Sequence, residues 1–127
     1  MRKSVENLAT SKITGGRRKP LRIRRKYETD RYPNEAINGA QVTITRRVRG
    51  SNNKVALKTI DFVNLSTGNG KVVKSKIIKV IDNTTNNDYK RRGIISKGAI
   101  LETQEGKCRV VSRPGQLGIV NAVLVKE

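Results

Sequence analysis

The sequence predicts an all-β protein: a small closed or nearly closed β-barrel of about six strands with an extended, basic N-terminal arm. Valine and isoleucine together number 25, against 13 for leucine plus alanine, and β-branched side chains favour strands over helices. After the first 40 residues, short apolar segments alternate with turn motifs, as is typical of small barrels. We therefore predict that residues 1–40 form an RNA-binding arm and that residues 41–127 form the barrel body.

The body is predicted to begin with a strand in residues 41–49. Val42, Ile44 and Val48 fall on one face and polar or cationic residues on the other, which indicates a half-buried strand with a cationic outer face. Residues 55–65 change the parity of their apolar positions, which either a β-bulge or a division into two short strands would explain.

Turn motifs separate the remaining predicted strands. Residues 66–70 form a hairpin turn that leads into a strand at 72–81. Residues 99–104 and 107–112 are expected to form a second hairpin, and Arg-Pro-Gly at 113–115 has the sequence of a type II turn.

The last predicted strand, residues 119–125, is apolar on both faces except at Asn121, so we expect a central or barrel-closing strand with Val123 in the core. Cys108 is the only cysteine and falls on the apolar face of its strand. It is expected to be a small core residue. The alternative is a reactive thiol beside Lys107 and Arg109.

Charge predicts the class of partner. The net charge is +18, with 14 Lys or Arg against 4 acids in residues 1–50 and 14 against 6 in residues 51–127. Residues 12–26 carry eight positive charges and no negative one, which favours an extended, mobile arm in isolation and a polyanionic partner. A protein that is basic throughout its length is expected to be surrounded by nucleic acid.

Several classes of function are excluded. The chain has no histidine and no phosphate-binding loop, and its acids show no metal-site spacing, so we expect no enzyme, metal, cofactor or small-molecule substrate. The acids of the body are instead expected to balance nearby Lys and Arg. No segment approaches the ~18 apolar residues of a membrane helix, so no membrane is expected. The N-terminus does not resemble a secretory signal, and the single cysteine fits a reducing cytoplasm.

Three clusters are predicted to bind RNA, mainly through phosphate and sugar because aromatic residues are few. Gly15 and Gly16 serve either close approach to a phosphate or a flexible hinge. Tyr27 and Tyr32 either stack on bases or pack the arm against the body, and a short helix is possible at 21–32. The first cluster comprises Lys12, Thr14, Gly15, Gly16, Arg17, Arg18, Lys19, Arg22, Arg24, Arg25, Lys26 and Tyr27. The second comprises Arg46, Arg47, Arg49, Asn52, Asn53 and Lys54. The third comprises Tyr89, Lys90, Arg91, Arg92 and Lys97, and Arg113 is added from the turn that follows.

Six segments resemble the eight-e family of small-subunit ribosomal proteins shared by archaea and eukaryotes. They are Thr-Gly-Gly-Arg-Arg at 14–18, Arg-Arg-Lys-Tyr-Glu at 24–28, Val-Arg-Gly-Ser-Asn-Asn-Lys at 48–54, Asn-Asn-Asp-Tyr at 86–89, Arg-Arg-Gly-Ile-Ile-Ser-Lys-Gly-Ala-Ile at 91–100 and Arg-Val-Val-Ser-Arg-Pro-Gly-Gln at 109–116. The compact length resembles that of archaeal members. The chain departs from the family pattern at Asp30, where glycine is common, and in its first eleven residues.

The resemblance implies a β-barrel with a basic arm, bound to ribosomal RNA of the small subunit beside neighbouring ribosomal proteins in the cytoplasm. It implies a structural role in subunit assembly and translation, without catalytic residues. From the residues alone, an architectural DNA- or chromatin-binding protein is the alternative, because phosphate contacts do not distinguish DNA from RNA. An RNA-modifying enzyme is disfavoured by the missing histidine and metal motifs.

Overall fold

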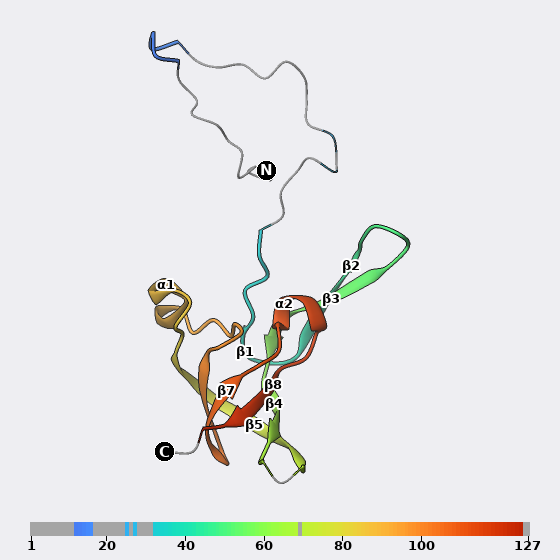
Figure 1. Cartoon of the computed structure of the whole chain (residues 1–127), viewed down its shortest axis with the longest axis vertical. Coiled ribbons are helices and arrows are strands. Elements are labelled where there is room, and N and C mark those ends of the chain that lie inside the picture. The colour runs from blue at the N-terminus through green and yellow to red at the C-terminus, as the bar shows by residue number, and fades with distance from the viewer. Residues whose placement is uncertain (1–11, 17–24, 26, 28–31, 69, 126–127) are drawn as a thin grey trace. The chain divides into compact units, whose positions relative to one another are not determined.

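A computed structural model of the protein describes residues 12–16, 25, 27, 32–68 and 70–125 (Figure 1). The chain divides into two compact units, Met1–Pro33 and Asn34–Glu127. The sequence analysis placed the boundary at residue 40; residues 34–40, including a short strand, belong to the second unit. Residues 21–32, where the sequence analysis allowed at most a short helix, lie largely outside the described residues.

The second unit contains a closed barrel of five strands. Their order around the barrel is β4 (Phe62–Ser66), β5 (Val72–Asp82), β6 (Ile100–Thr103), β7 (Gly106–Val110) and β8 (Asn121–Leu124) (Figure 1). Neighbouring strands are antiparallel, and β8 closes the barrel by pairing in parallel with β4. The predicted all-β barrel is confirmed, with five strands in the barrel instead of about six.

A separate three-stranded sheet has the order β1 (Ile37–Asn38), β3 (Asn53–Ile60) and β2 (Val42–Arg47). Strand β1 is parallel to β3, whereas β2 and β3 form an antiparallel hairpin that projects from the barrel (Figure 1). The predicted first strand is thereby confirmed. The parity changes in residues 55–65 are also explained, because β3 ends at Ile60 and β4 begins at Phe62.

Alternating strand positions fill the core with aliphatic side chains. Val63 and Leu65 of β4, for example, are completely buried, and Leu101 of β6 faces them from the same cluster. Cys108 is also fully buried in this cluster, and burial raises the pKa of its thiol. The expectation of a small core cysteine is confirmed, and a raised pKa gives no support to the reactive-thiol alternative.

Two short helices occupy segments where the sequence predicted none. Helix α1 (Asn87–Arg91) begins after Asn86, whose side chain accepts a 2.8 Å hydrogen bond from the Asp88 N–H. Helix α2 (Pro114–Leu117) has its proline in the first turn and ends at Gly118, where φ is 71°. The type II turn predicted at 113–115 is wrong, because a proline suits the first turn of a helix as well as the second position of a turn.

Strand β8 closes the barrel as expected, but only one of its faces is buried. Ala122 is 2% exposed and points inward, whereas Val123 is 45% exposed. The expectation that Val123 lies in the core is wrong. Successive side chains of a strand point to opposite faces whatever their polarity, so apolar residues on both faces do not establish burial on both.

Candidate nucleic-acid interface

The described part of the arm contains a tight turn at the start of the first predicted cluster. The Lys12 N–H donates to the Gly16 carbonyl at 2.7 Å and the Gly15 N–H to the Lys12 carbonyl at 3.0 Å, and Gly15 has a φ of 80°. Lys12, Thr14 and both glycines are exposed. The positive φ explains why residue 15 is a glycine, whether the segment serves as a flexible hinge or approaches a phosphate closely.

The other members of the first cluster are described only in part. Arg25 is exposed and Tyr27 is 76% exposed. The remaining predicted positions lie outside the described residues: Arg17, Arg18, Lys19, Arg22, Arg24 and Lys26.

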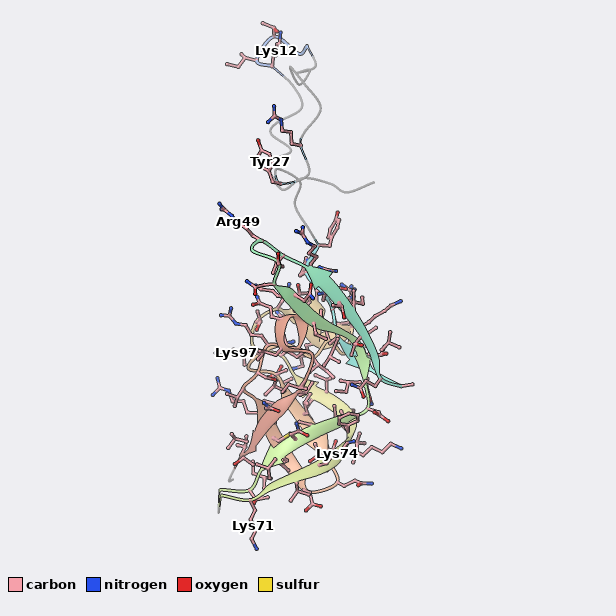
Figure 2. All side chains as sticks on the ribbon, turned by 90° about the vertical axis from the view of Figure 1, so that its right-hand side faces the viewer. Lys12, Tyr27, Arg49, Lys71, Lys74 and Lys97 are labelled. Carbon is pink, nitrogen blue, oxygen red and sulfur yellow. The ribbon has the colours of Figure 1, made fainter. Side chains whose placement is uncertain are left out.

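The second predicted cluster lies at the end of the β2–β3 hairpin, where the chain reverses. We define the hairpin tip by Arg47, Arg49, Asn53 and Lys54, all of which are exposed. Arg49 points away from the body (Figure 2). The reversal is tight: the Val48 N–H donates to the Asn52 carbonyl at 2.8 Å, and Gly50 and Ser51 have φ values of 72° and 60°.

The positive charges of the hairpin tip have no counter-charge among the residues that the structure describes. No carboxylate in the described part of the chain forms an ion pair with Arg47, Arg49 or Lys54. The projecting hairpin therefore carries an uncompensated positive field, which attracts a polyanion.

Arg46 belongs to the same predicted cluster but has a different environment. Its side chain is partly buried, and its Nη2 donates to the Oδ1 of Asn34. Asn34 in turn donates to the Gly115 carbonyl of α2 at 3.3 Å. Arg46 therefore helps to connect β2 with α2 and with the first residue of the second unit, while its other guanidinium donors are available to a ligand.

Arg113 directly precedes α2, the helix to which this connection leads. It is the exposed N-cap residue of α2. Helix α2 packs against β3, where Leu117 forms an isolated bridge with Val55. The structure therefore links Arg113 to β3 of the hairpin through a helix that the sequence analysis did not predict.

The third predicted cluster has internal acidic partners. Lys90 pairs with Asp82 at 3.2 Å, Arg91 with Asp88 at 2.8 Å, and Arg92 with both Asp88, at 3.3 Å, and Glu35. Lys97 is exposed and forms no ion pair with a described residue. The expectation that acids balance neighbouring cations is confirmed for Asp82 and Asp88.

These ion pairs shift the pKa values of two groups. The hydrogen bond from Lys90, followed by the 2.8 Å bond from the Asn83 N–H, lowers the pKa of the Asp82 carboxyl. The hydrogen bond to Glu35, followed by that to Asp88, raises the pKa of Arg92. Both shifts favour the charged forms, although the pairs are exposed and individually weak.

Asn83 positions the loop that carries the third cluster, and the sequence analysis did not identify it. Its side chain is 2% exposed and donates to the Ile94 carbonyl at 2.9 Å. Its Oδ1 accepts hydrogen bonds from the Thr85 N–H at 3.2 Å and the Ser96 hydroxyl at 3.0 Å. The two ends of the loop around α1 are thereby held together, next to Lys97. One asparagine among several in a polar segment gave no signal that it would be buried.

The sequence analysis also missed a row of lysines on β5. Lys74 and Lys76 are exposed and lie on one face of the strand, and Lys71 precedes them at the β4–β5 turn. The Lys74 ammonium lies 3.7 Å from the centroid of the Phe62 ring. A signal was present, because lysines at every second position of a strand share one face.

The described residues contain no group of three or more His, Cys, Asp or Glu that could hold a metal ion. Within those same residues, no helix is long and apolar enough to cross a membrane.

Comparison with known proteins identifies related sequences along nearly the whole chain. Residues 6–125 match the family model described as Ribosomal protein S8e. A protein of Methanocorpusculum labreanum, named small ribosomal subunit protein eS8, is 44% identical over 116 residues, covering 91% of this chain and 93% of the relative. Proteins of the same name from Nanoarchaeum equitans and Sulfolobus acidocaldarius are 44% identical over 115 residues and 42% identical over 118. These alignments cover 90% and 91% of this chain, and 91% and 92% of the respective relatives.

Proposed function

Because the chain belongs to the ribosomal protein S8e family, we propose that it binds ribosomal RNA as a structural constituent of the small ribosomal subunit. In this role it contacts RNA phosphates and RNA shape, lies beside other ribosomal proteins in the cytoplasmic ribosome, and supports subunit assembly and translation. The family is one of ribosomal proteins and not of enzymes, so the chain is not an enzyme.

The observation that carries the RNA-binding proposal is the uncompensated charge of the hairpin tip. Arg47, Arg49 and Lys54 are exposed on a projecting hairpin, without an ion pair to any described carboxylate. Arginine can form two parallel hydrogen bonds to one phosphate and can stack on an exposed base. The hairpin tip is therefore suited to enter a groove or junction of a folded RNA.

The third cluster contributes less in this proposal. A phosphate must compete with Asp82, Asp88 and Glu35 for Lys90, Arg91 and Arg92, so part of each RNA contact replaces an existing ion pair. Lys97 has no such competitor among the described residues. We therefore rank Lys97 above Lys90, Arg91 and Arg92 as a contact to RNA.

The arm supplies the densest group of cations. The arginines and lysines of residues 12–26 would follow the RNA backbone, with residues 1–40 largely extended, while Tyr27 is exposed and able to stack on a base. The phosphate contacts make binding strongly salt-dependent.

Sedimentation of the full-length chain tests the proposal. A tagged copy expressed in cells should migrate with the small ribosomal subunit in a sucrose gradient at magnesium concentrations that preserve the subunit. Absence from that fraction, with retention on chromosomal DNA, would overturn the proposal in favour of an architectural DNA-binding protein.

A matched pair of variants tests which cations contact RNA. Arg49→Gln removes a cation without a described counter-charge, and Arg91→Gln removes one that already pairs with Asp88. Arg49→Gln should lower affinity for the deproteinised ribosomal RNA and reduce the log–log salt slope by about 0.7–0.9, with a smaller effect for Arg91→Gln. Equal effects would contradict the ranking of the clusters.

A further inference from the structure

The outer face of β5 carries lysines that belong to none of the three RNA-binding clusters predicted from the sequence. Lys74 and Lys76 are exposed, whereas Ser75 and Ile77, the residues after each of them, are 5% and 2% exposed. The two lysines therefore share the outer face of the barrel, about 6.6 Å apart along the strand. Lys71 is exposed in the β4–β5 turn, directly before the strand. We name these three residues the β5 lysine surface.

The charge of this surface is not balanced inside the described part of the protein. The next lysine of the strand, Lys79, pairs with Glu102 of β6 at 3.1 Å, but no described carboxylate pairs with Lys71, Lys74 or Lys76. On the other side, the residues of β4 that face Lys74 and Lys76 across the sheet are neutral, Asn64 and Phe62 respectively. Adjacent ammonium groups without counter-charges repel one another, and a bound polyanion removes that repulsion.

The surface is also held in place before any ligand binds. The Lys74 ammonium lies over the Phe62 ring, 3.7 Å from its centroid, which restricts a side chain that is otherwise flexible. At the turn, both the N–H and the hydroxyl of Thr67 donate to the Lys71 carbonyl at 3.2 Å. Restricting the Lys74 side chain and the Lys71 backbone in advance reduces the conformational entropy lost on binding.

We infer that the β5 lysine surface binds a second stretch of ribosomal RNA, separate from the stretch bound by the hairpin tip. This inference rests on the proposed function. Arg49 and Lys71 lie at opposite ends of the second unit, and Lys74 lies on the barrel between them and away from the hairpin (Figure 2). Because the hairpin tip and the β5 lysine surface lie at different places on the second unit, each is assigned its own RNA segment, and the protein thereby bridges the two segments.

The chemistry of the surface favours RNA over an acidic protein as the occupant. Lysines are compact point charges that bind phosphates well, and the surface offers a row of them on a regular strand. A phosphate backbone presents a matching row of negative charges at short intervals.

The first test measures the salt dependence of binding to the deproteinised small-subunit RNA. The double variant Lys74→Gln, Lys76→Gln should reduce the log–log slope by about 1.4–1.8, because two phosphate contacts are lost. Lys79→Gln, on the same strand but paired with Glu102, is the matched control and should change the slope far less. An unchanged slope in the double variant, with normal binding by the wild type, overturns this inference and leaves the proposed function standing. Failure of the wild type to bind the RNA overturns both.

The second test locates the contacts by hydroxyl-radical footprinting of the same RNA. The double lysine variant and the variant Arg47→Gln, Arg49→Gln should each lose protection, at two groups of nucleotides that do not overlap. If both variants lost protection at the same nucleotides, the proposal that the protein bridges two RNA segments would be overturned. A lysine variant that keeps every RNA protection but loses a neighbouring protein from the purified subunit would identify that surface as a protein contact and overturn the assignment to RNA.

Discussion

Gly118 lies against Val55 so closely that a Cβ on residue 118 would be 2.6 Å from the Val55 Cγ1 and 3.0 Å from the Val55 Cβ. Gly118 ends α2 with a φ of 71°, and Val55 lies in β3 and forms the bridge with Leu117. The absence of a side chain thus allows α2 to pack directly on β3, at the residue that follows Lys54 of the hairpin tip.

Replacing Gly118 with alanine should destabilise the protein for two reasons. A left-handed φ costs a residue with a Cβ about 1–2 kcal/mol, and overpacking against Val55 adds about 1–3 kcal/mol. We expect urea denaturation to show a free energy of unfolding lower by about 2–5 kcal/mol in total. The matched control is Gly93→Ala, because Gly93 has a φ of 63° but no atom within 4 Å of its added Cβ. Equal destabilisation of the two variants would show that the contact with Val55 has no energetic role.

The two faces of β8 predict opposite outcomes for aspartate substitutions. Val123→Asp should change the free energy of unfolding by less than about 1 kcal/mol, because residue 123 is 45% exposed and faces Arg109 across the sheet. Ala122→Asp should destabilise the protein by several kcal/mol, since residue 122 is 2% exposed and the carboxylate would be buried without a partner. Thermal melts followed by circular dichroism distinguish the two; similar melting temperatures would contradict the inward orientation of Ala122.

The ion pair between Asp82 and Lys90 predicts a pH dependence of known sign. The pKa of the Asp82 carboxyl is lower in the folded state than the ordinary value of 3.8. Its stabilising contribution is therefore present above pH 3.8 and is lost as the pH falls through the lower folded-state pKa. An NMR titration should show Asp82 titrating below 3.8 in the wild type and closer to 3.8 in Lys90→Gln. The bond from the Asn83 N–H retains part of the shift in that variant. An unchanged Asp82 titration in Lys90→Gln would show that Lys90 does not cause the shift.

Removal of residues 1–27 should separate RNA binding from folding. The second unit, Asn34–Glu127, contains the barrel and its hydrophobic core, so the shortened chain should retain a cooperative unfolding transition. Its RNA affinity should fall, and its log–log salt slope should decrease by about 0.7–0.9 for each phosphate contact removed. A slope equal to that of the full chain would contradict the proposed role of the arm.

Much of the fold could be predicted because strand patterns and turn motifs are local properties of the chain. The strands 72–82, 100–103 and 106–110 lie where alternation and turns indicated them. The turn at 113–115 was predicted wrongly, because proline and glycine suit both a type II turn and the ends of a short helix. Packing of α2 against β3 decides between these two, and that contact joins residues far apart in the sequence.

For the candidate site, composition indicated a polyanionic partner, but it did not indicate which cations are paired with acids inside the protein. Arg49 and Arg92 look alike in the sequence, yet Arg49 projects from the hairpin and Arg92 binds Glu35, 57 residues earlier in the chain. A count of acids and bases describes the net field, whereas ion pairs depend on distances that only the folded chain defines.

The sequence by itself therefore determined the all-β class, the family and the excess of positive charge, because each of these is stored in residue identities and their spacing. Only the tertiary structure decided which strands close the barrel, which side of β8 is buried, and which cations of the described residues have acidic partners. The closure between β4 and β8, the burial of Ala122 and the ion pair of Lys79 with Glu102 all arise from contacts between distant segments, which no local pattern encodes.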